Sequence, residues 1–199
     1  RRSAKLCGVL VGHLEADARV PFLDEFLSLC KEDERGARLE HQEGALSATG
    51  YIVGSGTIPD VDALRAIRTF VGLAKKVGKG QSTEANLASV AAEAIGHAGL
   101  RKPLHADIIE DALDAVCGVL QNTDPNVAKL GARAAGHIML TDASESTASA
   151  LLPRLLAMCE VKHDDTQFAI GEAVACAWGG VNVDADRVLT TSFVSLNAA

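Results

Sequence analysis

The chain has 199 residues and a formal net charge of −7, with 48% hydrophobic but only 4% aromatic residues. Surfaces that bind nucleic acid or anionic membranes need clustered Lys and Arg, so this acidic balance argues against both kinds of ligand. No apolar run is long enough to span a membrane, and no signal peptide is visible. We therefore expect neither nucleic-acid binding nor membrane insertion, and a core built from Ala, Leu, Val and Ile.

A short motif of small residues followed by Gly and a ring-bearing residue recurs along the chain. Its copies read LVGH, ATGY, AIGH and AAGH, with a degenerate AVAC. With Gly12, Gly50, Gly96, Gly136 and Ala175 taken as one position, the steps are 38, 46, 40 and 39 residues. A period near 40 in an Ala- and Leu-rich chain predicts an all-α fold, a HEAT-like α-solenoid of about four and a half antiparallel helix pairs.

The expected elements follow this period. Residues 1–14 are predicted to hold the second helix of a repeat, and residues 185–197 the first helix of a further one. Four full repeats are expected between them, at about 19–53, 59–98, 103–140 and 148–179. Because the two end helices lack partners, we interpret the chain as a segment of a longer solenoid whose end helices expose apolar faces.

Local signals refine these elements in chain order. Pro59 and the Asp124-Pro125 pair stand at helix starts, and Ser82 or Thr83 can cap the second helix of its repeat. Residues 141–149 are predicted to form a polar loop, with a phosphorylation site in it as an open alternative. Residues 162–165 are predicted to form a charged turn. Two apolar stripes at helical spacing are expected to be buried: Phe22, Phe26, Leu29 and Cys30 in one helix, and Val61, Leu64, Ile67, Val71 and Ala74 in the next.

The recurrent Gly within the second helices predicts close approach of neighbouring backbones. Gly inside a helix costs roughly 1 kcal/mol relative to Ala. A chain that keeps it in four repeats therefore needs helices that pack at the short end of the usual range of about 8–10 Å.

Three histidines, His13, His97 and His137, share one repeat position, which Tyr51 occupies in the remaining copy. Equivalent positions of adjacent helices should lie about 8–10 Å apart, whereas metal ligands lie about 2 Å from one ion. We therefore predict a structural role for these rings and no metal site. The stretch at 40–43 (EHQE) resembles part of the HEAT-repeat deoxyhypusine hydroxylases, whose iron site uses adjacent His-Glu pairs, but the chain contains no adjacent His-Glu.

Neither the cysteines nor the glycine-rich stretch at 72–80 predicts chemistry. The five cysteines form no C-x-x-C pair, and Cys30, Cys117 and Cys159 are expected to be small buried residues in a reducing compartment. The stretch GLAKKVGKG departs from a phosphate loop in spacing, lacks the final Ser or Thr, and follows a helix instead of a strand. We predict no catalytic residue and no cofactor.

The strongest surface feature is an acidic stripe formed by Asp107, Glu110, Asp111 and Asp114. These positions share one face of a helix because they are spaced i, i+3, i+4 and i+7. The stripe is either a solvated outer face or a docking site for a basic partner surface, and it is our candidate for partner binding.

Three stretches carry a family resemblance. Residues 124–136 are similar to the HEAT consensus, with D-P-x-V followed by Lys129 and a run of small residues. Residues 167–173 (QFAIGEA) and 44–51 (GALSATGY) resemble the C-terminal half of the large proteasome adaptor and scaffold protein of the Ecm twenty-nine family. The resemblance implies a non-enzymatic protein that binds proteasome particles and links them to other cellular components, in the cytoplasm, with the nucleus open as a second location.

Two alternatives stay open. One is a HEAT-repeat scaffold for a different assembly, such as a transport, phosphatase or kinase-related array. The other is a HEAT-repeat metal-dependent hydroxylase.

Overall fold

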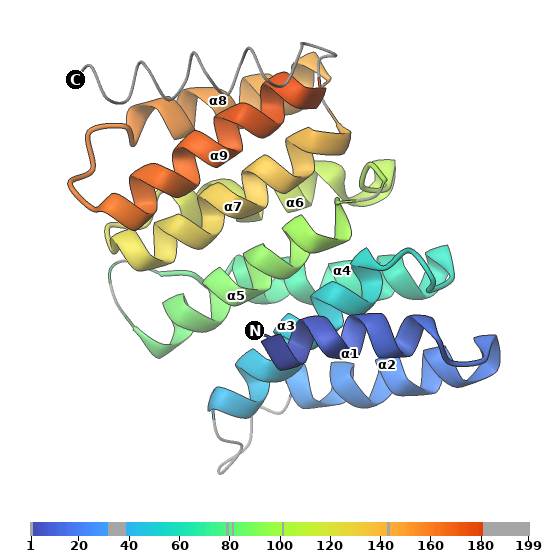
Figure 1. Cartoon of the computed structure of the whole chain (residues 1–199). Helices are drawn as coiled ribbons and strands as arrows, with labels where there is room; N and C mark the ends of the chain where they lie inside the picture. The colour runs from blue at the N-terminus through green and yellow to red at the C-terminus, as the bar shows by residue number, and fades with distance from the viewer. Residues whose placement is uncertain are drawn as a thin grey trace.

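A computed structural model of the chain describes residues 2–31, 39–78, 80, 82–100, 102–142 and 144–180. Over these residues the fold is all-helical, with nine α-helices and no strand. Figure 1 shows the helices stacked from α1 and α2 at one end to α8 and α9 at the other. The helices are α1 Arg2–Gly12, α2 Ala16–Lys31, α3 Leu39–Gly54, α4 Asp60–Ala74, α5 Thr83–Ala98, α6 Ala106–Leu120, α7 Pro125–Thr141, α8 Glu145–Ala157 and α9 Asp164–Gly180.

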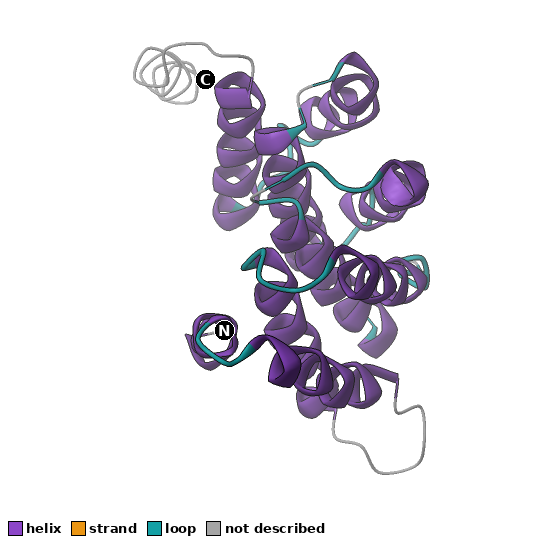
Figure 2. Ribbon diagram, turned by 90° about the vertical axis from the view of Figure 1, so that its right-hand side faces the viewer, coloured by secondary structure: helices purple, strands orange, loops and turns teal. Residues whose placement is uncertain are grey.

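The helices alternate between two layers. One layer holds α2, α4, α6 and α8, and the other holds α1, α3, α5, α7 and α9, with consecutive helices packed across the interface. Figure 2 shows the separation of the two layers along most of the stack. Neighbouring helices contact each other far more extensively in the α1–α9 layer than in the α2–α8 layer. The stack is therefore tightest along the odd-numbered helices, which carry the recurrent Gly motif.

Small residues dominate the core, as the composition predicts. Ala, Val, Leu and Ile fill most buried positions, and Phe70 is the largest fully buried side chain among the described residues. Helix α5 lies at the centre, where every residue from Ala91 to Ala98 is buried. Because neighbouring helices enclose this helix, its polar side chains Glu93 and His97 are buried as well, at 6% and 4% exposure.

Several helix starts follow the expected capping chemistry. The Ser82 hydroxyl accepts a hydrogen bond from the backbone N–H of Ala85, and the Asp124 carboxylate accepts one from Asn126, with Pro125 in the first turn of α7. The cap of α6 was not foreseen, because the His105 ring accepts from the Asp107 N–H. Gly78 and Gly80 adopt positive φ values of 59° and 72° before α5, where a side chain would strain the backbone.

The prediction of a polar loop over residues 141–149 is wrong. Helix α7 extends to Thr141, and α8 already begins at Glu145 behind an N-cap Ser144 whose hydroxyl accepts from the Thr147 N–H. Ser and Thr near a helix start favour capping over loop formation, and this explains the error. Likewise, α9 begins at Asp164, inside the predicted charged turn.

The two predicted apolar stripes are buried for the most part, but each has one exposed member. In α2 the buried residues are Leu23, Leu27 and Cys30, whereas Phe22 is 42% exposed. In α4 Ile67, Val71 and Ala74 are buried as expected, but Val61 is 80% exposed. Periodicity identifies a helix but leaves its rotation uncertain where apolar residues stand on more than one side.

Helix α1 exposes an apolar face, as predicted for an end helix. Leu6, Val9 and Leu10 are each more than half exposed, and they lie at the i, i+3 and i+4 positions of one side. The helix expected at 185–197 lies outside the described residues.

Candidate functional site

The tight layer is held together by glycines that contact alanines of the next helix. A Cβ at Gly50, Gly96 or Gly136 would lie 2.8, 2.6 or 2.7 Å from the Cα of Ala94, Ala134 or Ala173, respectively. Real Cβ atoms do not approach a backbone atom so closely, so only Gly permits these crossings. The predicted close approach is therefore confirmed at three of the four expected glycines.

The residue after each of these glycines carries a ring, and the three rings stack into a ring ladder formed by Tyr51, His97 and His137. The ring centroids of Tyr51 and His97 are 4.0 Å apart, and those of His97 and His137 are 5.4 Å apart. The expected spacing of 8–10 Å is wrong because it describes helix axes, whereas these side chains extend toward one another beside the closest crossings. Tyr51, which takes the place of a His in its repeat, is therefore part of the ladder.

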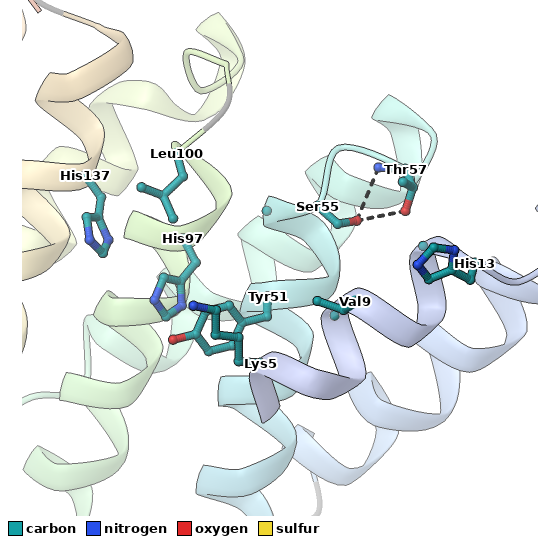
Figure 3. A pocket seen from close by; sticks show the side chains of 12 residues that line it. Lys5, Val9, His13, Tyr51, Ser55, Thr57, His97, Leu100 and His137 are labelled. Atoms are coloured by element: carbon teal, nitrogen blue, oxygen red, sulfur yellow. Dashed lines mark hydrogen bonds between the residues drawn. The ribbon is translucent and has the colours of Figure 1, made fainter. Parts of the chain in front are cut away.

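His13 does not belong to the ladder, because the repeat register of α1 differs from the prediction. A Cβ at Gly8 would meet Tyr51 at 2.8 Å, just as one at Gly54 would meet the backbone of His97. Gly8 is thus the structural equivalent of Gly54, and the first step of the repeat is 46 residues instead of 38. Lys5 then takes the ladder position of α1. His13 is exposed near the other end of that helix, away from the rings (Figure 3).

Two surface pockets share the ring ladder as a common wall. The N-terminal pocket has a volume of about 550 Å³ and is lined by residues of α1, including Lys5, together with the ladder and the turn after α3 (Figure 3). The ladder pocket has a volume of about 320 Å³ and lies between α3, α5, α7 and α9. Besides the three ladder rings, it is lined by Glu93, Arg133, Gly136, Glu172, Ala173 and Cys176.

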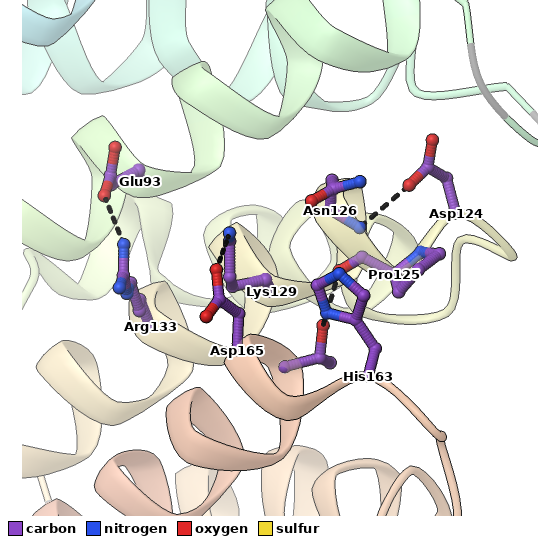
Figure 4. Close-up of polar contacts among 9 residues, drawn as sticks. Glu93, Asp124, Pro125, Asn126, Lys129, Arg133, His163 and Asp165 are labelled. Carbon is purple, nitrogen blue, oxygen red and sulfur yellow. Dashed lines mark hydrogen bonds and ion pairs between the residues drawn. The ribbon is translucent and has the colours of Figure 1, made fainter.

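The charges of the ladder pocket come from one position of the repeat. Glu93, Arg133 and Glu172 each stand three residues before an aligned repeat position, which is Gly96 on α5, Gly136 on α7 and Ala175 on α9. The Arg133 guanidinium lies 4.0 Å from the buried Glu93 carboxylate (Figure 4). Burial of a carboxylate is costly unless cations or hydrogen bonds compensate its charge, so Arg133 helps to keep Glu93 inside the fold.

The environment of the pocket changes the acidity of two of its groups. Burial, with a smaller contribution from the nearby Arg133 charge, lowers the pKa of His137 below its ordinary value near 6.5. The Nδ1 atom of His137 is buried and has no hydrogen-bond partner among the described residues. Burial, with the charge of Glu172, raises the pKa of the Cys176 thiol. An activated nucleophile needs a lowered thiol pKa, so Cys176 is not prepared for covalent catalysis.

Polar contacts outside the pocket fix α9 against α7. Lys129 forms an ion pair of 3.1 Å with Asp165, and the Thr166 hydroxyl donates a hydrogen bond of 2.8 Å to the Pro125 carbonyl (Figure 4). His163 lies 3.0 Å from the same hydroxyl. These contacts join the N-terminal ends of α7 and α9.

The acidic stripe is exposed on α6, in the other layer. All four of its carboxylates are exposed. Lys75, the residue after α4, pairs with Asp111 and lies 3.8 Å from Asp114, while the His105 ring lies 3.5 Å from Asp107. Lys75 therefore compensates part of the negative charge of the stripe, and Glu110 is its only member without an ion pair among the described residues.

The sequence predicts that three of the five cysteines are buried, and two of these are. Cys30 and Cys117 are buried as predicted, but Cys159 is exposed in the turn after α8. The prediction for Cys159 is wrong because α8 ends at Ala157, so the apolar periodicity no longer applies two residues later. In the part of the chain that the structure describes, no three His, Cys, Asp or Glu side chains cluster so that they could hold a metal ion.

Comparison with known proteins assigns no relative. No protein-family model matches the chain, and no curated protein matches it significantly. Among the described helices, none combines the length and the apolar character that crossing a membrane requires.

Sequence reasoning missed the residues that give the ladder pocket its charge. Glu93, Arg133 and Glu172 do not form a motif along the chain, because 40 and 39 residues separate them. Alignment of the repeats on Gly96, Gly136 and Ala175 would have placed these three residues in one column, three residues before the aligned position. Lys5 could not be found in this way, because the glycine chosen in the first repeat was Gly12.

Proposed function

We propose that this chain is a segment of a HEAT-like α-solenoid that acts as a protein-binding scaffold and has no catalytic activity of its own. The observation that carries the proposal is the recurrent contact between Gly50, Gly96 or Gly136 and an alanine of the next helix. These contacts repeat one geometry along the stack. Repeat arrays of this type build extended surfaces, and such surfaces suit the binding of other proteins.

Among possible partners, we propose the proteasome, on the basis of the two short resemblances to its large adaptor and scaffold protein. Both resembling segments contribute to the ladder and its pocket. Tyr51 ends the first, and in the second Glu172 lines the ladder pocket while Ala173 faces Gly136. The two resembling segments therefore contribute both to the packing between helices and to the lining of the ladder pocket.

The test is affinity purification of the tagged chain from cells of its source at mild ionic strength, with mass spectrometry of the bound proteins and the tag alone as control. We expect enrichment of proteasome subunits, and this enrichment should be lost when an excess of untagged chain is added as a competitor. Absence of proteasome subunits would remove the proteasome from the proposal. Enrichment of a transport, phosphatase or kinase assembly instead would favour the alternative scaffold.

The acidic stripe is the second contact surface that we propose for such a partner. Simultaneous reversal of its four charges to Lys should reduce partner recovery while leaving the fold intact, because exposed positions seldom contribute much stability. A matched control reverses four exposed carboxylates elsewhere, at Glu15, Glu25, Glu40 and Glu160. Equal recovery with the stripe variant and the control variant would exclude the stripe.

A further inference from the structure

We infer that the ladder pocket is a recognition site for an arginine side chain of a protein partner. The cavity lies beside the stacked rings of Tyr51, His97 and His137 and contains the carboxylates of Glu93 and Glu172. Its volume of about 320 Å³ is at the small end of the roughly 300–1,000 Å³ typical of ligand pockets. It therefore suits a single long side chain better than a large cofactor.

The charges of the pocket favour a cation. Its lining holds two carboxylates against one guanidinium, because Arg133 lies near Glu93 while Glu172 makes no ion pair with any described residue. Burial lowers the pKa of His137, so that ring is neutral at pH 7 and adds no positive charge. A cationic guest can pair with Glu172, which is exposed at the pocket and loses little hydration when it does so.

The groups that line the pocket favour Arg over Lys. A guanidinium is planar, can stack on an aromatic ring and can bind a carboxylate through two parallel hydrogen bonds. Tyr51, His97 and His137 line the pocket beside Glu172, and Glu172 supplies the carboxylate. Arg133 already places one guanidinium in this pocket, close enough to influence the pKa of His137. An ammonium group would gain the charge interaction but not the planar contacts.

The inference rests on the proposed scaffold function in one respect only, namely that a protein partner supplies the arginine side chain. The pocket itself can be tested on the 199-residue chain without any partner. The probe is an acetylated and amidated Gly-Ser-Arg-Ser-Gly peptide, added to the chain with isotope-labelled histidines. Two further peptides carry citrulline, which has a similar shape without charge, or lysine in place of arginine.

We expect saturable shifts of the His137 ring resonances with the arginine peptide, weaker ones with lysine, and none with citrulline. The variant Glu172→Gln should bind the arginine peptide with about fivefold lower affinity, as expected for the loss of one partly exposed ion pair. The matched control Glu25→Gln, at an exposed position of α2 outside both proposed contact surfaces, should bind like the parent chain.

The inference is overturned if the arginine peptide causes no saturable shift, if the citrulline peptide binds equally well, or if Glu172→Gln binds the arginine peptide as tightly as Glu25→Gln does. The comparison of arginine with citrulline uses the unmodified chain, so it decides the matter even if a variant folds poorly. None of these outcomes depends on whether the chain binds proteasomes. Failure of the pocket and failure of the proteasome assignment are thus distinguishable.

Discussion

Replacement of Gly96 by Ala should destabilise the stack, although Ala is the better helix former. The new Cβ would lie 2.6 Å from the Cα of Ala134 and 3.2 Å from its Cβ and its carbonyl oxygen. The nearest obstacle is a backbone atom, which cannot rotate away as the end of a flexible side chain can. Helices α5 and α7 must therefore separate at their closest crossing.

The magnitude follows from two opposing effects. The better helix propensity of Ala stabilises by about 1 kcal/mol, whereas overpacking a tight core costs about 1–3 kcal/mol or more. A contact of 2.6 Å must open by about 1 Å to reach the usual carbon–carbon distance of about 3.5–4.0 Å. The upper end of the cost therefore applies, and we expect a net destabilisation of about 2 kcal/mol.

The assay is urea and thermal denaturation followed by circular dichroism, with Gly72→Ala as the matched control. Gly72 lies in α4, is exposed, and a Cβ there would meet nothing within 4 Å. For a chain of this size, Gly96→Ala should lower the Tm by about 4–8 °C and Gly72→Ala should raise it by about 2–4 °C. A Gly96→Ala variant as stable as Gly72→Ala would refute the close packing of α5 on α7.

Three further predictions concern single features. The pKa of His137 is lowered in the folded chain, so the unfolded chain binds the proton first as the pH falls. Stability should therefore decrease below about pH 6.5. The difference in Tm between pH 7.5 and pH 5.5 should be smaller for His137→Gln than for the parent chain. Exposed Cys159 should react with Ellman's reagent in the native chain, whereas Cys30, 1% exposed, should react only after unfolding, and equal rates would contradict this burial. Replacement of Leu6 and Leu10 by Gln should reduce self-association of the chain in sedimentation, since both are more than half exposed on α1, and an unchanged sedimentation coefficient at high concentration would argue against that face.

The sequence by itself determined the helical class and the tight crossings. Gly50, Gly96 and Gly136 recur in helices that would be more stable with Ala, and only close backbone approach explains that choice. Capping residues such as Ser82 and Asp124 correctly marked helix starts, because their side chains satisfy backbone N–H groups within the same turn. These features are local, so the residue types and their spacing are enough to predict them.

Only the tertiary structure decided which residues meet between repeats. A motif match aligned His13 with His97, but the packing of Gly8 against Tyr51 places Lys5 at that position instead. The sequence could not reveal the shift, because α1 offers glycines at two positions four residues apart and the choice depends on the neighbouring helix. The same holds for the ladder pocket. Glu93, Arg133 and Glu172 line one cavity because α5, α7 and α9 pack side by side, and the sequence alone does not show which residues of neighbouring helices face each other.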